Sequence, residues 1–327
     1  MALIRNIEEV KQHLPVTVAQ SIENLDTYIA LAEQKFIIPE FGSETYDYIL
    51  TKYNANTISD AKDVELLNLL QKAVTFYAYM LYIPVGQLQI SDNGIRIAVT
   101  ESLKTAFDWQ IDDLEESFKD AGDTCVELIF QHLNKYISFF TAYAASNAFI
   151  EWKKQFISTA NQFNLRCSVP ITHRIFKKIS MDILICQSRD IKSMLGNPFY
   201  ADLLLKWKNN NITGIYVEII EKIQFAMANI ALAGAVKSLS VGVNDLGVNV
   251  STNSIFKQKV KTPATNDQAS GLIEKLLNDG NYWLGQLKLL LEANRTDLPL
   301  YADAFPVSDT NGSVFIENKK ENGLYFI

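Results

Sequence analysis

The feature that most constrains the fold of this chain is an internal repeat. Residues of the first half recur in the second at a constant separation of 154 positions: Leu25, Ile29, Ala32, Gly42 and Tyr46 match Ile179, Ile183, Cys186, Gly196 and Tyr200. A helix, a glycine break and another helix therefore appear twice in the same order, which is hard to obtain by chance. The sequence predicts two divergent copies of one module, with two unrelated helical domains as the alternative.

The correspondence continues beyond this first helix pair. The segment LQKAVTFYAYMLYIPVGQLQISDNGIRI corresponds to IEKIQFAMANIALAGAVKSLSVGVNDLGVNV if three residues are inserted in the second copy. The last helix pair recurs at a separation of 158 positions, where Leu114, Phe118, Gly122 and Leu133 match Leu272, Leu276, Gly280 and Leu291. At 327 residues, two domains are also what chain length favours.

Apolar residues at three- and four-residue steps predict that the protein is mainly α-helical. Asn6 is placed to cap a first helix, and Ser43 a third. The second helix is expected to end near Pro39, and the long helix from about Asp63 before Pro84 and Gly86.

Each module also contains a predicted β-hairpin, because the helical period gives way to short Ile- and Val-rich runs around turn-forming residues. The candidate interaction residues are, in the first hairpin, Ile90, Asp92, Asn93, Gly94, Ile95 and Ile97, and, in the second, Val243, Asp245, Gly247, Val248 and Val250. Such an arm can add a strand to a partner or pack into its groove. That each hairpin only covers its own helices is equally compatible with the sequence.

These patterns divide the chain into a first helix-hairpin-helix module (1–150), a second (151–298) and a C-terminal extended segment (299–327) that forms a short hairpin or strand. The segment between the modules is either a connecting helix or an extended crossing segment.

Composition restricts the functional classes. The net charge of −7 argues against sequence-specific DNA binding, although a mildly acidic surface suits a passage through which DNA moves without sticking. Cys125, Cys167 and Cys186 have no metal-ligand spacing and are expected to be reduced core residues. The N-terminus has no secretory pattern and the apolar stretches are short for a membrane span, so the cytoplasm is the expected location.

No motif for catalysis is present. Phosphate-binding glycine loops, nucleophile elbows and zinc-ligand pairs are missing from the sequence, so neither an enzyme nor a bound metal or cofactor is expected. His132 is expected to be a hydrogen-bonded structural histidine, and His173 to belong to a solvated basic face. The acids from Asp108 to Asp120 project opposite an apolar stripe and are expected to lie in solvent.

Four segments carry a family resemblance: LIRNIEEVKQHLPV, FIIPEFG, LQISDNGI and FISTANQFN. Together they resemble a poorly characterised family encoded in phages and prophages of the Bacteroidetes among virion morphogenesis genes. The resemblance implies a virion structural protein, a head-tail connector or neck (adaptor) component. THRIFKK in the second module departs from the serine-arginine pair expected there.

The leading hypothesis is therefore a homo-oligomeric ring that contacts portal and tail or neck proteins in the virion, assembles in the host cytoplasm, and lets DNA pass. The alternative is a cytosolic bacterial adaptor or binding protein without catalytic activity, with a groove between its modules. An enzyme of unrecognised type is a third alternative.

Overall fold

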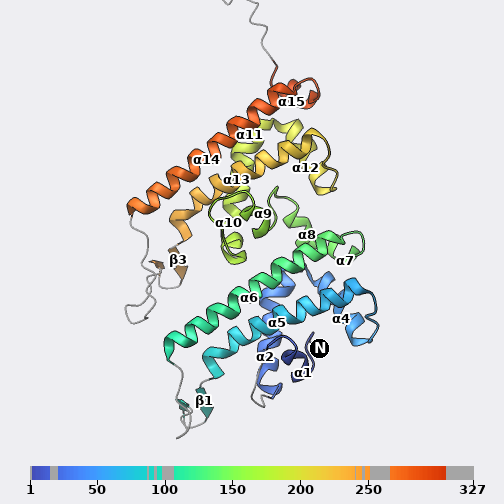
Figure 1. Cartoon of the computed structure of the whole chain (residues 1–327), viewed down its shortest axis with the longest axis vertical. Helices are drawn as coiled ribbons and strands as arrows, with labels where there is room; N and C mark the ends of the chain where they lie inside the picture. Colours follow the sequence, from blue (N-terminus) through green and yellow to red (C-terminus); the bar gives the residue numbers. More distant parts are fainter. Residues whose placement is uncertain are drawn as a thin grey trace, which may run out of the picture.

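The computed structural model describes residues 2–14, 21–86, 88–91, 94–97, 107–239, 241–244, 247–250 and 266–306. The described chain is mainly helical, and its two modules stack along the long axis in the same orientation (Figure 1). Two separate hydrophobic clusters, one per module, form the core, and the Trp152 side chain packs against both. The prediction of a mainly helical chain with an internal repeat is confirmed.

The first module contains α1 (Ile7–Lys11), α2 (Glu23–Ala32), the π-helix η1 (Glu33–Ile37), α3 (Ile38–Phe41), α4 (Ser43–Asn54), α5 (Ala61–Gly86), β1 (Leu88–Ser91), β2 (Gly94–Ile97), α6 (Asp108–Lys135) and α7 (Thr141–Ala144). After α8 (Asn147–Trp152), the second module contains α9 (Ala160–Asn164), α10 (His173–Cys186), the π-helix η2 (Gln187–Ile191), α11 (Lys192–Leu195), α12 (Asn197–Lys208), α13 (Ile215–Leu239), β3 (Val241–Asn244), β4 (Gly247–Val250), α14 (Asn266–Ala293) and α15 (Pro299–Ala304). The two orders are the same.

The repeat extends to local backbone geometry. The two π-helices are 154 positions apart, and so are Gly42 and Gly196, whose φ angles are +83° and +74°. Only glycine adopts such angles without strain. A Cβ at Gly42 would also lie 2.8 Å from Ser146 Cβ, and one at Gly196 2.6 Å from Ala304 Cβ, so both breaks let the end of the module pack closely.

A hydrogen-bonded junction at the start of each module is repeated as well. The Leu3 N–H donates to Glu33 Oε1 (2.7 Å), and the Leu3 carbonyl accepts from Gln71 Nε2 (2.8 Å). In the second module the Phe156 N–H donates to Gln187 Oε1 (2.9 Å), and its carbonyl accepts from Gln224 Nε2 (2.7 Å). The π-helix therefore holds the first segment of its module in both copies.

Long helices pair in each module, α5 with α6 and α13 with α14 (Figure 1). The paired helices pack closely at Gly122 and Gly280, where a Cβ would lie 2.6 Å from Tyr77 Cε1 and 2.5 Å from Ile230 Cγ1. The buried residues of α5 and α13 match at a separation of 153, beginning with Leu66 and Ile219. The predicted three-residue insertion is therefore wrong, because this separation holds from the long helix into the strands.

The strands form two antiparallel pairs that follow α5 and α13. Ile90 pairs with Ile95 and Leu88 with Ile97 in the first, and Val243 pairs with Val248 and Val241 with Val250 in the second. The predicted turn residues Asp92, Asn93 and Asp245 lie outside the described residues, as does the expected C-terminal hairpin.

Several predicted boundaries are wrong for local reasons. Ser43 is the first residue of α4 and does not cap it, because Gly42 occupies the capping position. Pro39 lies in the first turn of α3, where its missing N–H costs nothing, so the chain stays helical to Phe41. Pro84 lies inside the last turns of α5, which runs on to Gly86. The Asn6 cap is confirmed, since its side chain accepts from the Glu9 N–H at 3.0 Å.

Two segments also differ from expectation. The connection between modules is neither one helix nor an extended crossing, because α7, α8 and α9 are short helices joined by turns. The segment 299–327 begins with α15, whose Tyr301 is buried against Phe199. Since α15 occupies the place that α7 has in the first module, the second module continues at least to Ala304.

One helix is long and apolar enough to cross a membrane by length and composition, within Ile215–Val236 of α13. At 22 residues this apolar stretch is longer than the short apolar segment expected from the sequence. Of its most apolar 18 residues, 72% are buried inside the structure. It occupies the same core position as α5 does in the first module.

Candidate functional site: the inter-module contact

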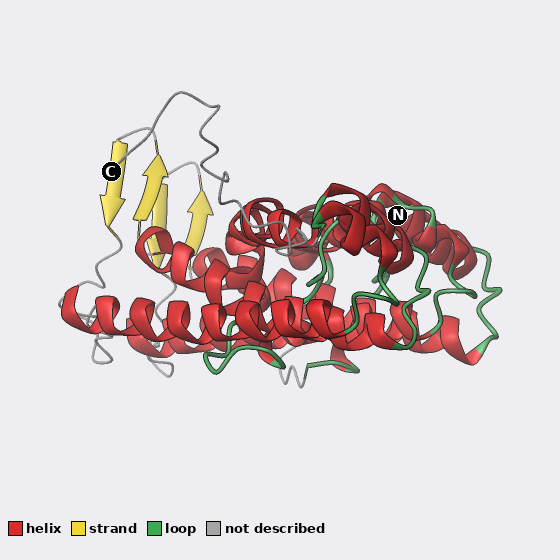
Figure 2. Cartoon of the chain, turned by 90° about the horizontal axis from the view of Figure 1, so that it is seen from above, coloured by secondary structure: helices red, strands yellow, loops and turns green. Residues whose placement is uncertain are grey.

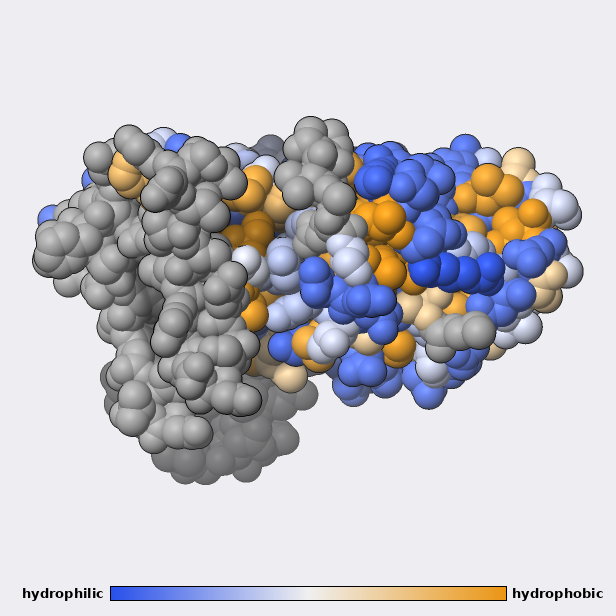
Figure 3. All heavy atoms as spheres, turned by 90° about the horizontal axis from the view of Figure 1, so that it is seen from below, coloured by the Kyte–Doolittle hydropathy of each residue, from blue (hydrophilic) through white to orange (hydrophobic). Residues whose placement is uncertain are grey.

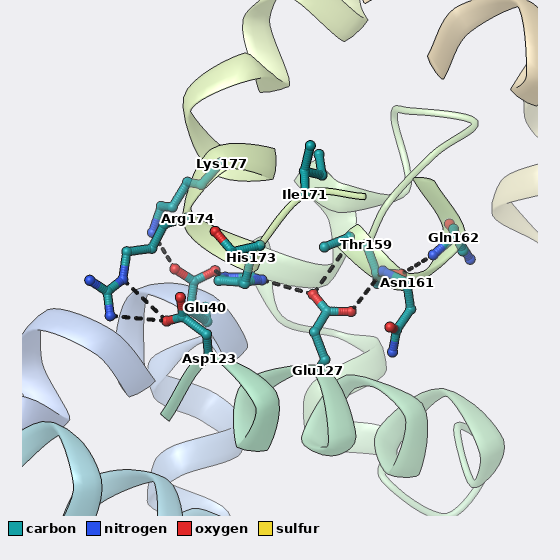
Figure 4. Close-up of polar contacts among 12 residues, drawn as sticks. Glu40, Asp123, Glu127, Thr159, Asn161, Gln162, Ile171, His173, Arg174 and Lys177 are labelled. Atoms are coloured by element: carbon teal, nitrogen blue, oxygen red, sulfur yellow. Dashed lines mark hydrogen bonds and ion pairs between the residues drawn. The ribbon is translucent and has the colours of Figure 1, made fainter. Parts of the chain in front are cut away.

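The largest group of buried charged side chains in the described residues lies where the two modules meet, with a half-buried arginine and an exposed lysine beside it (Figure 4). The first module contributes Glu40 from α3, and Asp123 and Glu127 from α6. The second contributes His173, Arg174 and Lys177 from the first turns of α10. We call these six side chains the inter-module contact. Acids come from one module and bases from the other.

His173 lies at the centre of this contact. Its Nδ1 is 2.9 Å from Glu127 Oε1, and its Nε2 is 3.4 Å from Glu40 Oε2. The side chains of His173 and Glu40 are each only 5% exposed, so water screens this pair very little. Phe130 packs beside the imidazole, with ring centroids 5.9 Å apart. The predicted solvated position of His173 is therefore wrong, because α6 and α3 cover that face of α10.

Glu127 also binds the backbone of the second module. Its two carboxylate oxygens accept from the Ala160 N–H (3.2 Å) and the Asn161 N–H (3.1 Å) at the start of α9. Glu127 thus fixes the position of α9 and α10 together. A side chain without a carboxylate at this place would leave three donors without their partner.

Glu40 and Asp123 complete the contact on the other side of His173. Lys177 donates to Glu40 Oε1, and the Trp152 indole N–H donates to the Glu40 carbonyl at 3.3 Å. Asp123 Oδ1 accepts from Tyr77 Oη at 2.7 Å and from Arg174 Nε at 3.2 Å. The Tyr77 bond ties the contact to the core of the first module.

The electrostatics of the contact favour a charged histidine. Burial alone lowers the pKa of His173, but the hydrogen bonds and charges of Glu127 and Glu40 outweigh it and raise this pKa to about 9. Burial acts to raise the pKa of Glu40, yet His173 and Lys177 bring it below its usual value. Burial raises the pKa of Asp123 to about 6, against the lowering effect of the Tyr77 hydrogen bond.

This arrangement can fix how one module sits on the other. Buried ion pairs add little net stability compared with apolar packing, but breaking one leaves an unpaired charge at a cost of roughly 3–5 kcal/mol. Any other register of the two modules would separate these charges, so the contact selects one register. In the described part of the chain, no three His, Cys, Asp or Glu side chains are grouped so as to hold a metal ion.

Two open clefts flank the contact. One, of about 490 Å³, lies between α6 and the α9–α10 segment and includes Asp123, Glu127 and His173 in its lining. The other, of about 460 Å³, lies between α3, α8 and α10 and includes Pro39, Trp152 and Lys177. Both clefts are formed by residues of both modules.

The candidate residues predicted from the sequence lie elsewhere. The strands that contain Ile90, Gly94, Ile95 and Ile97 follow α5, and those that contain Val243, Gly247, Val248 and Val250 follow α13, both at the same end of the long helices (Figure 1). Their role as interaction arms stays a prediction.

The other sequence predictions fared differently. His132 is buried and its Nε2 lies 2.9 Å from the Lys62 carbonyl oxygen, which confirms a structural role. The three cysteines are buried and free, as expected. Sequence reasoning missed Asp123 and Glu127, although their position inside the apolar run GDTCVELIF was a signal for buried carboxylates.

Comparisons with known proteins agree with the duplication. One family model, described as a family of unknown function, matches residues 37–150 and 191–310. No curated protein and no solved structure matches the chain. The two matched regions start at Ile37 and Ile191, which are equivalent positions at the ends of η1 and η2. Because the matches cover more than half of the sequence, the chain belongs to the family of unknown function DUF6712 and carries its characteristic region twice.

Proposed function

We propose that this protein is a structural component of a phage virion, a connector or neck (adaptor) subunit that forms a homo-oligomeric ring at the head-tail junction. The observation that carries the proposal is the stacking of two like-oriented modules through two different faces. The upper side of the first module, formed by α3 and α6, meets the lower side of the second, formed by α9 and α10 (Figure 1). A head-to-tail contact of this kind can be repeated, and it closes into a ring when the rotation between successive subunits permits closure.

In this proposal the protein acts by binding alone, joining portal to tail or neck proteins. The strand pairs β1–β2 and β3–β4 serve as arms toward those partners, since both lie at the same end of the long helices (Figure 2). The net charge of −7 disfavours tight binding of phosphate backbones, which suits a ring through which DNA passes. Assembly takes place in the cytoplasm of the bacterial host.

The experiment is a measurement of particle mass on the purified chain, by mass photometry and negative-stain electron microscopy. We expect closed particles of many subunits, together with the protein in purified virions detected by mass spectrometry. A chain that stays monomeric at tens of micromolar and is missing from virions contradicts the proposal.

A second candidate function is a cytosolic bacterial adaptor without catalytic activity, which the two clefts at the inter-module contact favour. A monomeric chain that binds a host protein or small molecule in these clefts supports it. Substitution of Gln131, an exposed residue of α6 that lines the cleft beside α9, then weakens that binding without changing particle mass.

A further inference from the structure

Among the described residues, the stacking of the modules leaves one equivalent face uncovered at each end of the stack. The upper face of the second module is formed by η2, α11 and α14, the counterparts of η1, α3 and α6. The lower face of the first module is formed by α1 and α2, the counterparts of α9 and α10. Figure 1 shows α14 at one end of the stack and α1 and α2 at the other. Each face has the backbone of a surface that is buried inside the molecule.

The upper face is hollowed at positions whose counterparts Glu40, Val126 and Phe130 are buried in the first module. A cleft of about 490 Å³ opens there among Ser193, Met194, Leu284, Lys288 and Tyr301. Ser193 and Met194 correspond to Pro39 and Glu40, against which α8 and α10 pack in the inter-module contact. On the same helix Tyr282 is 60% and Leu289 is 65% exposed.

The two uncovered faces carry opposite charges at positions whose counterparts meet in the inter-module contact. On the upper face, Lys192 and Lys288 are exposed and occupy the places of Ile38 and Phe130. On the lower face, Glu23 and Asp26 are exposed and occupy the places of Lys177 and Ser180. In the inter-module contact, Ile38, Lys177 and Ser180 line the same cleft. If the inner stacking is repeated, Lys192 therefore faces Glu23 and Asp26.

The acids of the lower face lie in a mainly hydrophilic surface. Figure 3 shows this end of the molecule, where hydrophilic residues dominate the described part and apolar areas are smaller. Glu8 on α1 adds a further exposed carboxylate, paired with Lys11. The upper cleft also contains Asp190 and Glu292, which are paired with Arg189 and Arg295. Compared with the inner contact, the signs are therefore reversed: Lys192 and Lys288 belong to the upper face, and Glu23 and Asp26 to the lower one. The two uncovered faces are thus complementary in charge to each other, and not to the two faces buried between the modules.

We propose that the lower face of one copy of this chain docks on the upper face of a second copy and repeats the inter-module contact with the charges reversed. This inference rests on the proposed ring, and names its subunit contact. The α2 helix of one subunit lies along α11 and α14 of its neighbour, with Glu23 and Asp26 beside Lys192 and Lys288. The lower face of a subunit and the buried upper face of a first module both carry acids. Because these like charges repel, a subunit cannot insert its lower face between the modules of another.

The test uses two charge-reversed full-length chains, Glu23→Lys/Asp26→Lys and Lys192→Glu/Lys288→Glu, with Lys208→Glu on α12 as control. Each reversed chain has like charges on both of its faces, so neither assembles alone at the concentration where the unmodified chain does. An equimolar mixture of the two restores assembly, with an even number of subunits per particle, because alternation of the two chains joins opposite charges at every contact. The control assembles normally.

The outcomes separate the inference from the proposed function. If the unmodified chain assembles and the reversed chains assemble equally well, the contact lies elsewhere and this inference is wrong while the ring stands. If the mixture fails to restore assembly although circular dichroism shows both chains folded, the inference is also overturned. If the unmodified chain never assembles, the ring proposal and the inference both fail.

Discussion

The upper faces of the two modules share one backbone and differ in chemistry. In the first module this face carries Glu40, Asp123 and Glu127, buried under the second module. At the equivalent positions the second module has Met194, Asn281 and Gly285. The residues that set the geometry are kept, as Gly42 and Gly196 show, whereas those that choose a partner have changed. Duplication has therefore preserved the module and given its two copies different neighbours.

Among the substitutions that test this difference, one at Glu127 is expected to have the largest effect on stability. Replacing it in Glu127→Ala removes the acceptor for His173 and for two backbone N–H groups, and leaves a buried charge poorly paired. We expect the free energy of unfolding to fall by about 3 kcal/mol, measured by urea denaturation. The control is Glu274→Ala on the exposed side of α14, with a change within about 0.5 kcal/mol. Equal effects of the two substitutions would show that Glu127 is not buried in a contact.

The next effect concerns a place where the modules are alike. Gly280→Ala puts a Cβ 2.5 Å from Ile230 Cγ1 and should destabilise the protein by about 1–3 kcal/mol through overpacking. Gly285→Ala on the same helix meets nothing within 4 Å and should stabilise by roughly 0.5–1 kcal/mol through helix propensity. In the double variant Gly280→Ala/Ile230→Ala the two costs should not add. Additive costs, from thermal denaturation, would contradict the close approach of α13 and α14.

A smaller effect on stability is expected at the repeated junction, where the first module has Glu33 and the second has Gln187. Burial raises the pKa of Glu33, with the Leu3 N–H and Tyr46 hydroxyl acting in the opposite direction. Because the folded state holds the proton more tightly than the unfolded one, stability falls as pH rises from about 4.5 through the raised pKa. Glu33→Gln copies Gln187 and should remove this dependence.

The size of that effect is about 1 kcal/mol of added stability at neutral pH, from the removal of a poorly solvated charge. The matched change, Gln187→Glu, should destabilise the second module, because Gln187 Nε2 donates to the Lys154 carbonyl at 2.8 Å. Measurement of unfolding free energy from pH 4 to 8 checks both variants. Loss of stability in Glu33→Gln at every pH would mean that the carboxylate is required.

The fold was largely predictable because its signals are local. The spacing of apolar residues and the Asn6 cap depend on neighbours within a few positions, and the repeat made each half a check on the other. The π-helices were missed, since apolar spacing across Glu33–Ile37 resembles that of an ordinary helix. The continuation of α5 past Pro84 was missed because proline near a helix end loses only one backbone bond.

The candidate site was not predictable in the same way. A helical projection sends the acids at the start of α6 into solvent, and this holds for Glu116 and Asp120, whereas Asp112, Asp113 and Glu115 are half-buried. Asp123 and Glu127, further along α6, lie on the side that the second module covers. Nothing within α6 indicates that a second body lies there. His173 was placed in solvent for the same reason, because its partners are 46 and 133 positions away in the chain.

The most direct test of the stacking is the pKa of the His173 imidazole, measured by nuclear magnetic resonance. We predict a pKa of about 9, so that the stability it contributes is complete below about pH 6.5 and is lost as pH rises through 9. A pKa near 6.5 that stays unchanged in Glu127→Gln would place the ring in water, and the modules would not be joined as described.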